Sequence, residues 1–281
     1  LTTVGSTYAW FTTTGDASVS GMDITAQGEG NGIFISTDDG ATYNRSVDLG
    51  EKYFKDIKLS PATSLDGKTF SYLKSEVHAA TQVDGKYVFS YGKVDNNNQA
   101  KYYVGFDLEF AVTADTSIYF YANEVNGGDE MKKVSRMSVS VYESDDNKAF
   151  NTTSGTATTY VFEEKVADVN TDYALDAMNK LYGKTVVNKS YGIYVGDTTN
   201  TTNRNDEFNK ATLLSKDHDN STLLVENTKT YALDNKVIPG SEGQFKFARV
   251  HFNFWIEGND YLCSNKVIAQ QLAASLVFIS K

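Results

Sequence analysis

The sequence predicts a mainly β protein, an antiparallel β-sandwich with one or two short helices in its connections. Aromatic residues make up 13% of the 281-residue chain, and aromatic and β-branched side chains suit the pleated, half-buried surface of a strand. Several stretches also alternate apolar and polar residues with a period of two. Such alternation places one face of a strand against a core and the other in water, as in an antiparallel sandwich.

Three stretches carry the clearest alternation. In residues 250–257 the apolar row is Val250, Phe252, Phe254 and Ile256, and the opposite row is His251, Asn253, Trp255 and Glu257. The other two apolar rows are Tyr102, Val104, Phe106, Leu108 and Phe110, and Met137, Val139 and Val141. We expect each apolar row in the core and each opposite row in solvent. Shorter predicted strands cover residues 33–36, 69–73, 86–91, 117–121, 160–163, 191–195 and 223–225.

Asp-Gly pairs separate several of these strands, at residues 39–40, 66–67 and 84–85. Both residue types tolerate the positive φ that tight hairpin turns require. These pairs therefore predict turns.

One helix is expected at residues 171–182. Thr171 can cap it, an apolar stripe follows at helical spacing, and Gly183 ends it. A weaker helical turn is predicted at residues 206–214. Because no linker-like stretch divides the chain, we expect one sandwich domain over residues 16–281, preceded by an extended segment, residues 1–15.

Composition narrows the function classes. The net charge is −10, the pI is near 4.8 and no Lys/Arg cluster occurs, which argues against nucleic-acid binding. No apolar run approaches the roughly 20 residues of a membrane span. The chain opens at Leu1 without a methionine, so we expect that an export signal has been removed and that the protein is secreted to the cell surface. Cys263, the single cysteine, is expected to be an inert buried residue.

Catalytic motifs are absent from the sequence. The three histidines, His78, His218 and His251, stand apart, and no zinc, phosphate-loop or nucleophile-elbow motif occurs. We therefore predict no enzyme, no catalytic residue, no cofactor and no metal ligand. Two alternatives stay open: a carboxylate pair of the glycosidase kind, and calcium bound by the oxygen-rich residues 95–98, 145–147 or 217–220.

The N-terminal segment has an unusual composition. It has no charge before Asp16, yet carries Val4, Tyr8, Trp10 and Phe11. Fifteen extended residues reach roughly 50 Å. Because chain termini are usually polar and frayed, a segment of this composition is predicted to be buried as a strand.

The same segment carries a family resemblance. Residues 5–12, GSTYAWFT, followed by residues 19–24, VSGMDI, resemble the mature start of TasA/camelysin-like proteins, which Gram-positive bacteria export to the cell surface and to biofilm fibres. Residues 58–70 and 250–263 resemble a broader set of surface proteins that share that export signal. The resemblance implies a jelly-roll sandwich and, for TasA-like members, extracellular fibres in which an N-terminal strand is donated to the next subunit. Camelysin has been classed as a metalloprotease, but this sequence has no zinc motif.

We therefore expect a structural subunit of an extracellular filament or biofilm matrix fibre, whose partners are copies of itself. The predicted intersubunit donor strand contains Leu1, Val4, Tyr8, Trp10 and Phe11. If the segment instead pairs within its own domain, the alternative is a monomeric surface module that binds a carbohydrate or host ligand. Such a module would expose Trp10 and Trp255 on one wet face, as a stacking platform for sugar rings.

Overall fold

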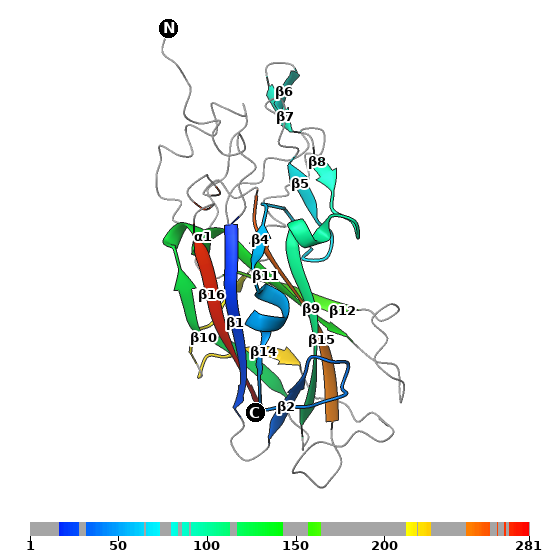
Figure 1. The fold of residues 1–281 in the computed structure, drawn as a ribbon, viewed down its shortest axis with the longest axis vertical. Helices are drawn as coiled ribbons and strands as arrows, with labels where there is room; N and C mark the ends of the chain where they lie inside the picture. The colour runs from blue at the N-terminus through cyan, green and yellow to red at the C-terminus, as the bar shows by residue number, and fades with distance from the viewer. Residues whose placement is uncertain are drawn as a thin grey trace.

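Two six-stranded sheets pack face to face in the computed structural model (Figure 1). The structure describes residues 17–27, 32–64, 66–73, 80–83, 86–89, 91–112, 117–142, 157–163, 212–217, 219–225, 246–258, 263, 267 and 270–280. The predicted helix at 171–182 and the predicted strand at 191–195 lie outside these residues.

The first sheet has the strand order β14-β10-β16-β1, and both β3 and β4 pair with the far side of β1. Its strands are β1 (Ala17–Gln27), β3 (Ser46–Asp48), β4 (Ile57–Leu59), β10 (Ile118–Gly127), β14 (Thr222–Val225) and β16 (Gln271–Ser280). Figure 1 shows β10, β16 and β1 side by side on the left of the molecule.

The second sheet has the order β13-β12-β11-β15-β9-β2. Its strands are β2 (Ile33–Ser36), β9 (Tyr103–Val112), β11 (Ser135–Tyr142), β12 (Ala157–Glu163), β13 (Thr212–Leu213) and β15 (Lys246–Ile256). Two small hairpin-like sheets add β5 (Ser71–Leu73) with β8 (Tyr91–Lys93), and β6 (Ala80–Val83) with β7 (Lys86–Phe89).

The strand order is that of a jelly roll. The order β1-β16-β10-β14 in one sheet faces β9-β15-β11-β12 in the other, and the chain passes between the sheets from β9 to β10, β10 to β11, and β14 to β15 to β16. The predicted antiparallel β-sandwich is confirmed, with two parallel pairs as local exceptions. β1 pairs with β16 in parallel, and β12 pairs with β13 in parallel.

Short helical elements occupy the connections, as expected. They are α1 (Asp129–Val134) between β10 and β11, η3 (Gln99–Lys101), and η2 (Gly50–Phe54), a single π-helical turn. The helical turn predicted at 206–214 is wrong where the structure describes it, because Thr212 and Leu213 pair with Phe162 and Glu163 as β13. Of the helices in the described part of the chain, none is long and apolar enough to cross a bilayer.

The core lies between the sheets. Every member of the predicted row Val250, Phe252, Phe254 and Ile256 is buried, with at most 4% exposure. Aromatic rings join the sheets: Phe252 stacks on Phe106 at 5.3 Å and meets Phe278 of β16 edge-on at 6.2 Å. Cys263 is a buried free thiol in this core, as predicted.

A further set of residues covers part of the outer face of the second sheet. We call residues 60–64, 66–73 and 91–102 the outer layer; they pack around Trp255, which meets Phe70 edge-on at 5.2 Å. The prediction that the opposite row of β15 faces solvent is therefore wrong for Asn253, Trp255 and Glu257, which are all buried. Trp255 Nε1 donates to the Glu257 carboxylate at 3.0 Å, so the buried indole N–H has a partner. The polar row of β11, Arg136, Ser138 and Ser140, is buried in the same way.

One Asp-Gly turn brings the outer layer against the sheet. Gly67 has φ +70°, and a Cβ there would lie 2.4 Å from the Ser138 Cβ. The position thus needs glycine both for its conformation and for close approach. The Gly67 carbonyl accepts from Ser138 Oγ at 2.7 Å and from Asn253 Nδ2 at 3.0 Å. The turn at Asp39 and Gly40 also has positive φ at both residues, as predicted.

Candidate functional site

The predicted donor-strand residues Leu1, Val4, Tyr8, Trp10 and Phe11 lie outside the residues that the structure describes. The structure does show where the chain after them enters the fold. Ala17, the first residue of β1, pairs with Leu59 of β4, and Ser18 pairs with Gln271 of β16. Strands thus flank β1 on both sides.

The opposite flank of the sandwich is built from the edges of both sheets. β14 covers β10 only along Ile118–Phe120, and β13 pairs only with Phe162 and Glu163 of β12. The chain between β13 and β14 adds one bond to each sheet. Leu214 N donates to the Glu163 carbonyl at 2.7 Å, and Ala122 N donates to the Ser215 carbonyl at 2.8 Å.

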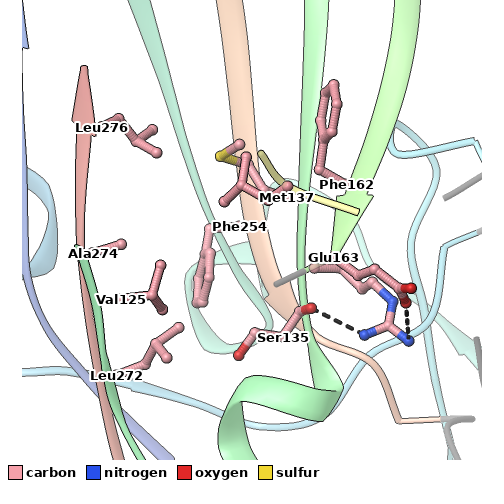
Figure 2. A pocket seen from close by; sticks show the side chains of 11 residues that line it. Val125, Ser135, Met137, Phe162, Glu163, Phe254, Leu272, Ala274 and Leu276 are labelled. Carbon is pink, nitrogen blue, oxygen red and sulfur yellow. Dashed lines mark hydrogen bonds and ion pairs between the residues drawn. The ribbon is translucent and has the colours of Figure 1, made fainter. Parts of the chain in front are cut away.

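A small apolar cavity lies between the sheets near this flank. Its volume is about 30 Å³, and a cavity needs roughly 10–15 Å³ to hold one water molecule. Figure 2 shows Val125, Leu272, Ala274 and Leu276 on one side, facing Met137, Phe162 and Phe254. This cavity is too small for an organic ligand.

A buried ion pair lies beside the cavity. Arg136 of β11 and Glu163 of β12 are cross-strand neighbours, with Nη2 and Oε2 3.4 Å apart and both side chains at most 1% exposed. Arg136 Nη1 also donates to the carbonyls of Lys133 and Ser135. Figure 2 shows the Glu163 carboxylate directed away from the apolar lining. The pair therefore lies within a structural network, and the cavity itself is apolar.

A second polar cluster crosses the outer face of β9 and β15. Asp107 Oδ1 lies 2.9 Å from His251 Nδ1, and His251 Nε2 lies 3.0 Å from Asn253 Oδ1. Arg249 contacts Asp107 at 3.3 Å, Asp39 at 3.0 Å and Glu109 at 3.7 Å. The sequence placed His251 in the polar row of its strand, and the structure gives it one cross-strand partner, Asp107, and one partner on its own strand, Asn253.

The electrostatics of this cluster follow from its ion pairs. Partial burial raises the pKa of Asp107, but the hydrogen bond and charge of His251 and the charge of Arg249 outweigh it, so the pKa lies below its usual value. Burial and the neighbouring Glu109 carboxylate raise the pKa of Tyr43, whose hydroxyl donates to Glu109 at 3.1 Å. Asp107 is therefore held as an anion and Tyr43 as a neutral donor.

The Asp107–His251 pair does not meet a nucleophile among the described residues. The imidazole nitrogen away from Asp107 faces an amide oxygen, and the hydroxyl of Ser140, which pairs with His251 across β11 and β15, is hydrogen-bonded to Thr159 Oγ1 at 2.8 Å. General-base catalysis needs the base within reach of the proton it abstracts. The cluster thus joins β9 and β15 on the outer face of the second sheet.

The predicted calcium-type loops form turns where they are described. The Asp95 carboxylate accepts from Asn97 N at 2.9 Å, and the Asp217 carboxylate accepts from Asp219 N and Asn220 Nδ2. No cluster of three or more His, Cys, Asp or Glu side chains suited to a metal occurs in the described part of the chain. Residues 145–147 lie outside it.

Acid should weaken the contact of the outer layer. Partial burial raises the pKa of Asp66, but the N–H groups of Thr69 and Lys68, at 2.6 and 2.8 Å, outweigh it, and the net shift is downward. The stability that this lowered pKa contributes is present above the ordinary carboxyl pKa and is lost as the pH falls through the folded-state value. In a denaturation series between about pH 5 and pH 2, Asp66→Asn should therefore lose less stability than the unsubstituted chain. Equal acid slopes for both would contradict this assignment.

One described residue bears on the binding-module alternative. The binding-module alternative needs Trp255 on a wet face, but its side chain is fully buried. It offers no stacking surface for a sugar ring. The signal in the sequence was the tryptophan itself, which stands in a row otherwise made of polar residues.

Comparison with family models, with curated proteins and with solved structures found no match to this chain.

Proposed function

We propose that the protein is a structural subunit of an extracellular filament or biofilm matrix fibre, without enzymatic activity, joined head to tail by its N-terminal strand. The observation that carries the proposal is the uncharged segment before Asp16, rich in large apolar side chains, which leads directly into β1 of the sandwich. A lone strand leaves its own backbone groups unsatisfied. Pairing with a sheet edge of another copy would satisfy them.

The position of β1 supports an open assembly. β1 lies at one flank of the first sheet, paired with β3 and β4, whereas the incompletely covered edges of β10 and β12 lie at the other flank. A segment that leaves one flank and binds the opposite flank of a neighbour makes a heterologous contact. Repeated contacts of this kind build a filament unless the rotation between subunits closes a ring.

A charge placed in the segment should abolish assembly. We expect Trp10→Asp to prevent fibres, because burying an unpaired carboxylate costs several kcal/mol, whereas the matched control Trp10→Phe should still form them. Negative-stain electron microscopy and sedimentation of the full chain would measure both. Fibres from Trp10→Asp, or a monomeric unsubstituted chain at high concentration, would refute the proposal.

A further inference from the structure

The edge strands of the sandwich differ in how well they are covered. Ile35 in the middle of β2 exchanges both backbone hydrogen bonds with Asn44, at 2.7 and 2.9 Å, so the outer side of β2 is occupied there. β3 and β4 are three residues each, and each contains an exposed charged residue, Asp48 in β3 and Lys58 in β4. Short strands and charges are the usual protection of a sheet edge.

β12 is protected neither by a short length nor by charges along Ala157–Phe162. It is seven residues long, and β13 covers only its last two. From Ala157 to Phe162 its sequence is Ala-Thr-Thr-Tyr-Val-Phe, without charge, glycine or proline. Of the described strands, none pairs with the outer side of residues 157–161.

The direction of the backbone groups along β12 follows from one hydrogen bond. The Glu163 carbonyl accepts from Leu214 N and therefore points away from β11. The backbone N–H and C=O groups of successive residues alternate sides along a strand. The backbone groups of Val161, Thr159 and Ala157 therefore also point away from β11. These three residues present a ladder to the next strand.

Two aromatic side chains of β12 lie on the core side of the sheet beside this ladder. Tyr160 continues the inner row of Phe162, with ring centroids 6.5 Å apart, yet Tyr160 is 45% exposed. Val139, its partner on β11, is fully buried. The inner face is thus well covered at β11 and incompletely covered at β12, as expected where a sheet can accept one more strand.

We propose that the outer edge of β12 at Ala157–Val161 is the acceptor of residues 1–11 of a second copy of the chain. This inference rests on the proposed function. Neither the edge nor the segment carries a charge, so neither side leaves a buried ion when they pair. β1, from which the segment departs, lies on the far flank, separated from this edge by β16 and β10 within its own sheet.

The test uses the full chain and its amide hydrogen exchange before and after assembly. The amides of Thr159 and Val161 should exchange rapidly in monomer and at least about tenfold more slowly in fibres, as expected for backbone groups that gain a partner. Thr159→Pro removes one outward N–H and should raise the critical concentration for assembly by about tenfold or more. The control Thr159→Val retains the N–H and loses the hydroxyl bond to Ser140, and it should assemble as the unsubstituted chain does.

The outcomes separate this inference from the proposed function. If fibres form but the Thr159 and Val161 amides exchange as in the monomer, another edge is the acceptor, and only this inference fails. Slow exchange of both amides already in dilute monomer would show a strand paired within the same chain and would also overturn it. If the unsubstituted chain never assembles, the proposed function fails too. Should Thr159→Pro not fold, the exchange measurement on the unsubstituted chain decides.

Discussion

Phe254→Ala is expected to lower the free energy of unfolding by about 3–5 kcal/mol, the usual cost of truncating a buried phenylalanine. Phe254 is 4% exposed, meets Phe54 edge-on at 6.2 Å, and already borders the small cavity between the sheets. Truncation would enlarge that cavity, and the cost rises with the volume that neighbours fail to fill. Chemical denaturation would measure the change.

Tyr160→Ala is the matched control for that experiment. It removes an aromatic ring that is 45% exposed, so its cost should be clearly smaller. Equal costs for the two variants, or no measurable cost for Phe254→Ala, would mean that the inner row of β15 has been assigned to the wrong face.

Glu163→Ala is expected to cost about 3–5 kcal/mol, because it leaves the buried Arg136 guanidinium without its carboxylate. Replacing both partners by apolar residues, Arg136→Met with Glu163→Leu, should be nearly neutral, since the desolvation cost of both charges disappears together. A denaturation comparison of the single and double variants measures the difference. A double variant that is less stable than Glu163→Ala alone would contradict this account of the pair.

The inner rows of the sandwich were predictable because their period is local. A row such as Val250, Phe252, Phe254 and Ile256 alternates within eight residues of sequence, and the structure buries all four. The core-facing side of each long strand needs no information from elsewhere in the chain.

The outer layer was not predictable from the same pattern. Asn253 and Ser138 look like solvent-facing residues, yet both donate to the Gly67 carbonyl, 186 and 71 positions away. Contacts at such separation leave no periodic signal. The parallel pairing of β1 with β16 joins the two ends of the described chain and escaped prediction for the same reason.

The candidate site was predictable only in part. The composition of residues 1–15 predicts that this segment needs a partner. The local sequence does not determine which strand pairs with an edge strand. That no described strand pairs with the outer side of residues 157–161 follows only from the three-dimensional pairing, in which β13 pairs with Phe162 and Glu163.

The central claim is that residues 1–11 contact a different copy of the chain. The most direct measurement places a photo-crosslinking amino acid at Tyr8 in an equal mixture of isotopically light and heavy full-length chains, assembled together. If residues 1–11 bind a different copy, cross-linked peptide pairs should combine a light with a heavy chain in the proportion that random mixing gives. Cross-links found only within light chains or only within heavy chains would show that the strand pairs in its own domain, and would contradict the account.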